Sequence, residues 1–486
     1  MAPPALTPRG RQVIINVGDA VYDLSSFEHP GGELALFGIA NSPDPLGLLY
    51  QYHEFSPQRL ATILAPYCIS AKPASVEELA RVRQPYERSC ELRLRLKTQL
   101  GSHIQRLRKW ETRFTQSMRY LGWPAFVAFV LATANGDAAV RACAVLLYAV
   151  YVHVVLVWNL HGQSHIVTRG ADDHIAYCWS CLPFAPHSLA WFMQHTVLHH
   201  SFTGVAHNLH EAQASNHVSF DPDVRFSGVL RLSPDEEWLP HHRHQWLYAP
   251  LALGLTVWAL LIDMVLLATK RQLQLYEDTK VALKGPGEAR WLSGLTLGSI
   301  GAVVGGVVLG GMPLGCFLMA MTLCSFSVGY VNIPTHTNLV TGHPADGDDY
   351  FAAQLAESTS YGGTVSNMLT AGLSKQIEHH IFPNAPFSAL PLMTPIVQQY
   401  AKEQGVQYNA FSSFGTCLVS WYRQVCYLAR EPQPPTSKVE PLCRKAGSIG
   451  ASTLKENCDK LNLDVPAVES LHEYRKAGAF KAVKHA

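Results

Sequence analysis

Charged residues are scarce in this sequence. Lys, Arg, Asp and Glu make up 15% of the 486 residues, hydrophobic residues reach 48%, and the 38 basic side chains nearly balance the 37 acidic ones. A protein that binds nucleic acid would carry a basic stripe to neutralise phosphates. The composition therefore argues against a nucleic-acid partner and favours a membrane protein.

Other features are missing as well. The 11 cysteines form no regular framework, which is typical of reduced thiols on a cytosol-facing or membrane-buried protein. The segment MAPPALTPRGRQ at the start has no apolar core after its basic residues, so a secretory signal peptide is not expected. There is no internal repeat and no Gly-rich phosphate-binding loop. If the protein is membrane-bound, internal apolar segments must insert it.

Histidine, in contrast, is abundant and grouped. The 23 histidines include pairs four residues apart, which share one face of a helix. Neutral imidazole is a good ligand for iron, so the groups predict a metal site. The groups are His161 and His165; His195, His199 and His200; Gln376, His379 and His380; and Asn332 with His336. We expect Pro334 to disturb the helix that carries the last group, and His153 to pack between helices rather than bind metal.

Five apolar stretches are candidates for membrane helices, which need ~20 residues. They are residues 120–134, 142–160, 246–269, 291–310 and 312–333. The first two predict a hairpin, and the basic run RLRKWETR before it favours a cytoplasmic N-terminal region. Ligands of one site must lie on one side of the membrane, so an even number of crossings must separate His200 from Gln376.

Two arrangements satisfy that condition. In the first, 246–269 is interfacial or re-entrant, and the last two stretches form a hairpin that turns at residues 310–313. In the second, 246–269 crosses and the last two stretches merge. The connection at residues 270–290 is net basic, which favours keeping it cytoplasmic and hence the first arrangement. Either way, about four transmembrane helices are expected.

The N-terminal region is soluble in character and carries the segment VYDLSSFEHPGGE. His29 precedes a Pro-Gly-Gly turn, and His53 follows later in the sequence. This segment and the separation of the two histidines together resemble cytochrome b5. The resemblance implies a small α+β domain over residues 10–70, with His29 and His53 as the axial ligands of haem b. Two prolines in ANSPDPLGLL predict an irregular helix between these histidines.

The histidine groups, placed after membrane segments and fused to a haem domain, resemble the front-end fatty-acid desaturases. Gln376 marks this subgroup, which has Gln in place of the first histidine of its third box. The resemblance implies an all-α integral membrane desaturase domain with a cytosolic histidine-rich cap over residues 119–430. A linker with an amphipathic helix (71–118) would precede it, and a disordered tail (431–486) would follow.

The same resemblance implies the cofactors and their ligands. Two non-haem iron ions would be held by His161, His165, His195, His199, His200, His336, His379 and His380, with Gln376 and Asn332 as further candidates. Dioxygen would be the cosubstrate. An acyl chain offers no acidic proton and no leaving group, so acid–base or nucleophilic catalysis cannot dehydrogenate it.

The implied activity is the insertion of a cis double bond between an existing double bond and the carboxyl end of a long-chain polyunsaturated acyl group. QHTVLHHSFTGV and DPDVRF are most similar to delta-4 and delta-5 enzymes, with delta-6 as another option. Two departures from the family are Gly204, where Asn is usual, and the inserted residues 205–220. The alternatives are a sphingolipid desaturase or fatty-acyl hydroxylase on the same scaffold, or a non-catalytic, membrane-anchored cytochrome b5 electron carrier.

The expected partners follow from this activity. The substrate would be an acyl-CoA or an acyl-phospholipid, and electrons would come from an NAD(P)H-dependent cytochrome b5 reductase. The protein would lie in the endoplasmic reticulum membrane, with its haem domain and iron site facing the cytosol. His207, His210 and His217, like the HHRH run at 241–244, are expected to be loop residues rather than ligands.

Overall fold

The computed structural model describes residues 13–29, 35–36, 38–39, 42, 44–165, 191–204, 221, 228–234, 236–259, 261–262, 288–342 and 349–431. This part of the chain is mostly helical and forms two compact units. The first unit comprises Met1–Cys90, Ser102–Ser201 and Leu253–Gly329; the second comprises Glu91–Gly101, Phe202–Ala252 and Tyr330–Ala486. Apart from residue 431, the predicted disordered tail (431–486) lies outside the described residues.

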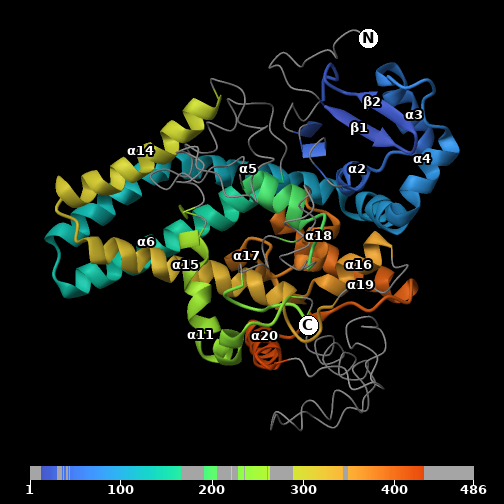
Figure 1. Cartoon of the computed structure of the whole chain (residues 1–486). Helices are drawn as coiled ribbons and strands as arrows, with labels where there is room; N and C mark the ends of the chain where they lie inside the picture. The colour runs from blue at the N-terminus through green and yellow to red at the C-terminus, as the bar shows by residue number, and fades with distance from the viewer. Residues whose placement is uncertain are drawn as a thin grey trace. The chain divides into compact units, whose positions relative to one another are not determined.

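The chain begins with a small α+β module in the first unit. Strands β1 (Ile14–Val17) and β2 (Ala20–Asp23) form an antiparallel hairpin. Gly18 in its tight turn has a φ of 58°, a conformation that glycine adopts without strain. Figure 1 shows the hairpin beside α2 (Pro45–Tyr52), α3 (Pro57–Leu64) and α4 (Val76–Arg83).

The helices of this module begin at clear signals. Asp44 caps α2 by accepting a hydrogen bond from the Gly47 amide, and Pro45 takes the first helical position, where its missing N–H costs nothing. The predicted irregularity was therefore wrong for α2, because Pro45 starts this helix instead of interrupting it. The shared core runs past residue 70 and includes Leu79 and Cys90. Two short 3-10 turns, η1 (Ala65–Tyr67) and η2 (Gln84–Tyr86), complete the module.

The apolar helices of the first unit follow. Helix α5 (Glu87–Asn135) has 49 residues and runs without a break from the charged segment into the first apolar stretch. Among the described residues, two helical segments are long and apolar enough to cross a membrane, Ala138–His161 and Leu314–His336. Two shorter apolar segments there are Tyr120–Asn135 and Leu297–Val308. Side chains of all four segments, such as Phe129, Tyr148, Val303 and Met321, share one core.

The later apolar stretches form separate elements. Helices α14 (Glu288–Val308) and α15 (Leu314–His336) are joined by a turn in which Gly311 has a φ of 69°, so the two stretches do not merge into one helix. The 246–269 stretch starts as α11 (Gln245–Ala252) and changes to a 3-10 turn, η6 (Leu253–Leu255). Helical residues follow at 256–259 and 261–262, and the rest of the stretch lies outside the described residues.

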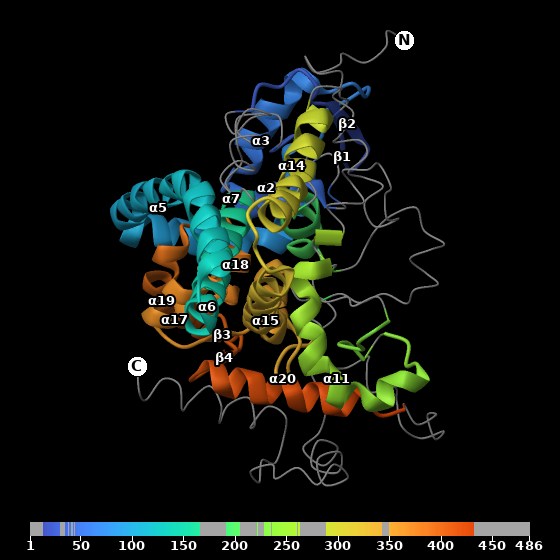
Figure 2. The ribbon, with the colours of Figure 1, turned by 90° about the vertical axis from the view of Figure 1, so that its left-hand side faces the viewer.

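The second unit is built from short helices and one small parallel sheet, β3 (Ser360–Tyr361) with β4 (Ala410–Phe411). Figure 2 shows α17, α18 and α19 close together, and α20 with one end against α11. The Gln245 side chain ties α11 to α20 by donating to the Val425 carbonyl at 3.0 Å. The helices of this unit are α16 (Tyr350–Glu357), α17 (Thr364–Thr370), α18 (Gln376–Ile381), η8 (Phe387–Ala389), α19 (Leu390–Glu403) and α20 (Phe414–Leu428).

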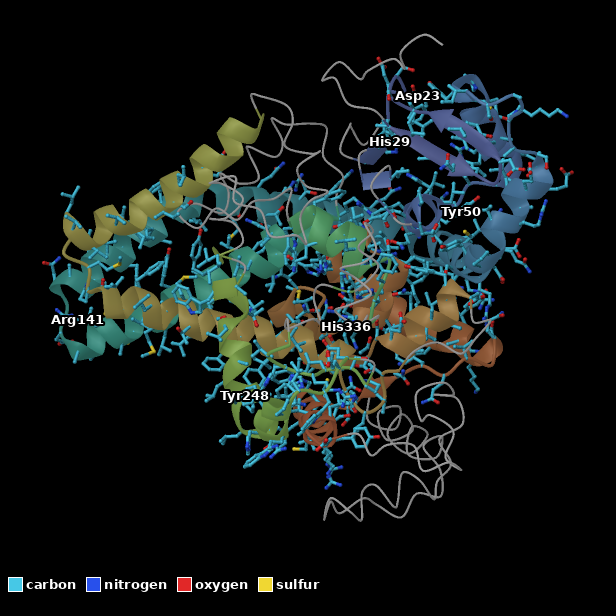
Figure 3. All side chains as sticks on the ribbon, in the orientation of Figure 1. Asp23, His29, Tyr50, Arg141, Tyr248 and His336 are labelled. Atoms are coloured by element: carbon cyan, nitrogen blue, oxygen red, sulfur yellow. The ribbon has the colours of Figure 1, made fainter. Side chains whose placement is uncertain are left out.

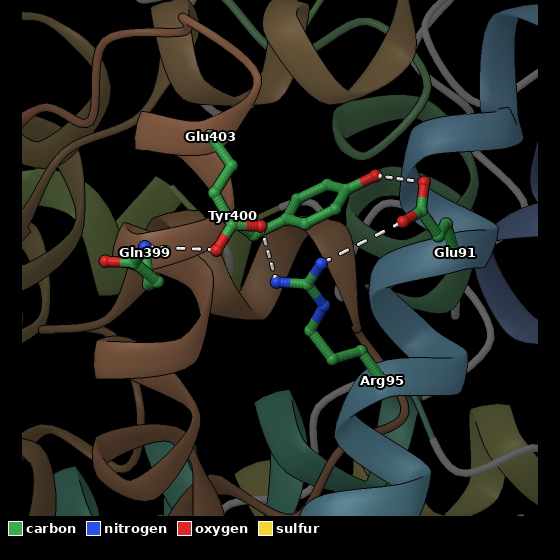
Figure 4. Close-up of polar contacts among 5 residues, drawn as sticks. All are labelled: Glu91, Arg95, Gln399, Tyr400 and Glu403. Atoms are coloured by element: carbon green, nitrogen blue, oxygen red, sulfur yellow. Dashed lines mark hydrogen bonds and ion pairs between the residues drawn. The ribbon is translucent and has the colours of Figure 1, made fainter.

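A polar network fixes α19 against the α5 residues that belong to the same unit (Figure 4). Arg95 donates to the Glu403 carboxylate at 2.7 Å, and its guanidinium lies 4.9 Å from the centre of the Tyr400 ring. The Tyr400 hydroxyl donates to Glu91 at 2.8 Å. The Arg95 charge holds the pKa of the Glu403 carboxyl below its usual value through this hydrogen bond. Because α19 packs on α18, the network supports the helix that carries the third histidine group.

Candidate metal centre

The first histidine pair lies where a helix widens. Helix α6 (Ala138–Val154) passes into a π-helical segment, η3 (Val155–His161), and then into a short α turn, α7 (Gly162–Ser164). His161 ends the π segment and His165 follows the α turn. Such π-helical turns are rare in proteins, and they occur often at functional sites. The Ser164 hydroxyl donates to the His161 carbonyl at 2.6 Å and helps to close the turn.

The second histidine group lies on another π-helical segment, η4 (Phe192–His199). The Thr196 hydroxyl donates to the Ser164 carbonyl at 3.1 Å and so joins the two π segments. We call the five histidines on or just after these segments the first histidine cluster: His161, His165, His195, His199 and His200. All five are almost fully buried, and their ring centres lie as close as 4.6 Å. The ligand atoms of His161, His165 and His195 lie within 4.8 Å of one another, which is a spacing that one metal ion can bridge.

The second histidine cluster, in the second unit, consists of His336, His379 and His380. Helix α18 carries the last two, and His336 ends α15. Figure 3 labels His336 near that helix end. The ring centres of His336 and His380 lie 4.8 Å apart, and all three side chains are buried. Gln376, also buried, donates from Nε2 to Asn332 Oδ1 at 3.2 Å.

The prediction that Pro334 would disturb α15 was wrong, because the helix continues to His336. The last carbonyl groups of a helix have no partner within the helix. At this end of α15, polar side chains donate hydrogen bonds to two of the carbonyls. Thr337 donates to the Ile333 carbonyl at 2.8 Å, and Asn338 donates to the Pro334 carbonyl at 2.7 Å. His336 is therefore held on a helical turn despite the proline.

Three histidines have a partner at the second ring nitrogen. His165 Nδ1 lies 3.4 Å from the Tyr52 hydroxyl, His380 Nδ1 lies 3.1 Å from the Thr203 hydroxyl, and His336 Nδ1 lies 3.3 Å from the Glu357 carbonyl. Histidines that bind metal almost always use their other nitrogen in this way, since it fixes the tautomer and the ring orientation. The pattern leaves Nε2 of each ring as the ligand atom.

This donor set fits iron. It consists of buried imidazoles, and the buried Gln376 Oε1 atom has no hydrogen-bond partner among the described residues. An amide oxygen in that state is available to a metal ion or to a bound water. The sequence pattern did not point to Tyr52, Thr203 or Glu357. Of these three residues, only Thr203 lies close in sequence to a histidine group, and this proximity was the one feature that could have indicated its role.

Buried carboxyl groups surround the second cluster. Glu378 accepts hydrogen bonds from Ser360 at 3.0 Å and from Tyr408 at 2.5 Å, and burial raises the pKa of its carboxyl group. Burial also raises the pKa of Glu357 well above its usual value, and the charge of Asp221 adds to the effect. These groups anchor the segments next to the ligands.

The departure at Gly204 has a conformational explanation. Its φ is 72°, and its amide donates to Asp221 at 2.8 Å. Glycine and asparagine are the residues that most readily adopt this left-handed conformation. Gly204 can therefore replace the asparagine expected from the resemblance without altering the turn. The inserted residues 205–220, with His207, His210 and His217, lie outside the described residues.

The histidines predicted not to bind metal have other partners. The Ser327 hydroxyl lies 3.0 Å from His153 Nδ1, which confirms a role in helix packing. The HHRH run forms a 3-10 turn, η5 (Pro240–His244), where the Nε2 atoms of His241 and His242 lie 2.7 and 2.8 Å from the Gly228 carbonyl. These two rings hold the backbone.

The predicted haem ligands face each other within the first unit. The ring centres of His29 and His53 lie 5.8 Å apart and the rings are tilted by 58°. Figure 3 labels His29 near the β1–β2 hairpin. Phe55 stacks on His53 with ring centres 4.9 Å apart, and burial lowers the pKa of His29, which favours a neutral ring. The Pro-Gly-Gly turn at residues 30–32 lies outside the described residues.

Comparison with known proteins agrees with this chemistry. Residues 201–412 match the model of the fatty acid desaturase family. The chain is 25% identical to an acyl-lipid (7-3)-desaturase of Diacronema lutheri, over 86% of this chain and 90% of the relative. It is 24% identical to the enzyme of the same name from Rebecca salina, over 86% and 91%.

A third relative is an sn-1 linoleoyl-lipid 6-desaturase of Synechocystis, 26% identical over 49% of this chain and 66% of the relative. No solved structure matches the chain significantly. Over residues 201–412 the chain is therefore similar to the fatty acid desaturase family, and the histidine boxes with the buried clusters that they form fit a di-iron oxidoreductase.

Proposed function

We propose that this protein is a front-end acyl-lipid desaturase that inserts a cis double bond between an existing double bond and the carboxyl end of a long-chain polyunsaturated acyl group. The burial of every box histidine, with neutral partners on the second ring nitrogens of His165, His336 and His380, is the observation that carries the proposal. Two relatives that align over 86% of the chain are named acyl-lipid (7-3)-desaturases, which favours delta-4 regioselectivity. Delta-5 and delta-6 remain the neighbouring options.

In this proposal the eight box histidines hold two iron ions, with Gln376 and Asn332 as neighbouring polar groups. Iron held there would activate dioxygen to remove hydrogen from an unactivated carbon. The chain's own residues keep the ligand rings neutral and oriented. Tyr52, Thr203 and the Glu357 carbonyl fix the ring tautomers. The buried carboxylate of Glu378 anchors the turn that carries His379 and His380.

The electrons are proposed to arrive through a haem held by His29 and His53, which an NAD(P)H-dependent cytochrome b5 reductase would reduce. The α+β module and the facing rings support this assignment. Fusing the carrier to the desaturase raises its effective concentration. We place the protein in the endoplasmic reticulum membrane with the haem module and iron site on the cytosolic side, because basic residues precede the first apolar segment.

Product mapping tests the function. A heterologous host that makes no polyunsaturated acids receives separate C18, C20 and C22 polyunsaturated acids, and mass spectrometry locates new double bonds. The proposal predicts a new bond on the carboxyl side, in acyl-lipid before acyl-CoA. A hydroxylated product, or a product confined to sphingolipids, would contradict it. His244→Ala, in the exposed η5 turn, serves as a matched control for His199→Ala.

A further inference from the structure

Two consecutive residues of the haem module contact the histidine boxes within the first unit. Helix α2 ends at Tyr52, and His53, the proposed haem ligand, is its C-terminal cap. The Tyr52 hydroxyl lies 3.4 Å from His165 Nδ1. The preceding residue, Gln51, donates from Nε2 to the His200 carbonyl at 3.5 Å. At the end of α2, Tyr52 is therefore next to the proposed haem ligand His53 in sequence and in contact with His165 of the proposed iron site.

We propose that Tyr52 is the positioning residue through which electrons pass from the haem module to the iron site. This inference rests on the proposed function, because it needs a haem on His53 and iron on His165. The route runs from the His53 ring along one peptide unit to Tyr52, and from the Tyr52 hydroxyl to the His165 ring. Apart from the 3.4 Å contact, every step on this route is a covalent bond.

The chemistry of the contact suits both ends. When Nε2 of His165 binds a metal ion, the ring proton is on Nδ1, which then donates to the Tyr52 oxygen. His165 is 1% exposed and Tyr52 is partly buried, so the histidine side of the contact is shielded from water. Each transfer oxidises ferrous haem to ferric and delivers one electron to the iron site. Two transfers are needed for each double bond, and the NAD(P)H-dependent reductase restores the ferrous haem each time.

Gln51 provides a matched comparison. It contacts the same region at a similar distance, but its partner is the backbone carbonyl of His200 and not a ring. Gln51 therefore contributes to docking without lying on the route. If docking alone mattered, the loss of either side chain would have the same effect. If the ring contact carries the electron, only the loss of the Tyr52 hydroxyl slows the transfer.

The experiment follows haem oxidation in the full-length protein. Haem is reduced without oxygen and then mixed with oxygen and substrate in a stopped-flow spectrometer. The haem of the Tyr52→Phe variant should be oxidised about tenfold more slowly than that of the native protein. This change is equivalent to ~1.4 kcal/mol in activation free energy. The low-spin haem spectrum and the iron content of the variant should be unchanged. Gln51→Ala should retain nearly the native rate.

Three controls separate the outcomes. Tyr67→Phe, a hydroxyl deletion elsewhere in the haem module, should have no effect. His199→Ala measures the direct oxidation of haem by oxygen, which is subtracted. Soluble cytochrome b5 added in excess should restore product formation by Tyr52→Phe, since it supplies electrons without the internal route.

An unchanged haem oxidation rate in Tyr52→Phe would overturn the inference and leave the desaturase function intact. Equal slowing in Gln51→Ala, or a loss of iron from Tyr52→Phe, would also overturn it, because docking or ligand orientation would then explain the effect. If the native protein shows no low-spin haem spectrum, the proposed haem function fails first, and the electron route fails with it.

Discussion

The two histidine clusters are held in place by different means. In the first cluster the rings lie on two π-helical segments and pack mainly against one another and against Trp191, which stacks on His195 at 4.9 Å. In the second cluster, groups from distant segments bind the rings and their helix. Thr203 contacts the His380 ring, and Ser360 and Tyr408 donate to Glu378 of α18. Thr203 and the Glu357 carbonyl thus contact two of the three rings in the second cluster. In the first cluster the contact of Tyr52 with His165 adds to the π-helical backbone geometry. Changes to neighbouring polar groups should affect the second cluster more strongly.

The largest effect should come from removing one ligand of either cluster. His199→Ala and His380→Ala should each abolish product formation and lower the bound iron, because each removes a buried imidazole that no neighbouring group can replace. Iron content by mass spectrometry of the purified protein and product analysis measure the two effects. His244→Ala should retain both. Activity left in either ligand variant would show that its cluster is not needed for the reaction.

A smaller effect should separate the clusters. Thr203→Val removes the hydroxyl at 3.1 Å from His380 Nδ1 at nearly constant volume, and it should weaken iron binding by about 10- to 100-fold, as other outer partners of metal ligands do. Thr196→Val is the matched change in the first unit, where the hydroxyl binds the Ser164 carbonyl and no ring. Iron binding should then fall much less. Equal losses, measured by competition with a chelator, would contradict the comparison.

The third prediction concerns the anchor of α18. Glu378→Ala leaves two buried hydroxyl donors, on Ser360 and Tyr408, without their acceptor, and should lower the free energy of unfolding by ~1–3 kcal/mol. Glu378→Gln keeps an acceptor at the same position and should lose less. Thermal unfolding in detergent, followed by tryptophan fluorescence, compares the two variants. A native midpoint in Glu378→Ala would show that the network does not anchor the helix.

The smallest effect is a pH dependence in the second unit. His242 Nδ1 accepts a hydrogen bond from the Leu239 amide at 2.9 Å, and burial lowers the pKa of this histidine from 6.5. The unfolded chain therefore binds the proton more tightly than the folded protein does. The contribution of His242 to stability is fully present above pH 6.5 and is lost as the pH falls below that value toward the lowered pKa.

His242→Gln keeps one acceptor and one donor but does not titrate. Its thermal midpoint should equal that of the native protein at pH 8 and fall less as the pH decreases below 6.5. An identical acid slope in both proteins would show that the ring contact with Leu239 does not control the local stability.

The sequence predicted the ligands better than their supports. Residues four apart, such as His161 and His165, are recognisable because helical spacing alone brings them together. The partners Tyr52 and Thr203 were not predictable, since they lie 113 and 177 residues away from the rings that they contact. The π-helical segments were also missed, because no residue type specifies a widened turn. Pro45 and Pro334 were misjudged for a related reason: the effect of a proline depends on its position within the helix.

Helix α5 has a mechanical consequence. Its 49 residues form a rod of about 74 Å at 1.5 Å per residue, which is more than twice the ~30 Å of hydrocarbon that a membrane helix crosses. Much of the segment expected to be a linker with an amphipathic helix (71–118) thus belongs to one continuous helix, which resists twisting about its axis. Inserting a single alanine after Gly101 would rotate one end against the other by roughly 100° while lengthening the chain by only ~1.5 Å. Such insertions would therefore change the rotation of one helix end about the helix axis relative to the other end, much more than the distance between the two ends.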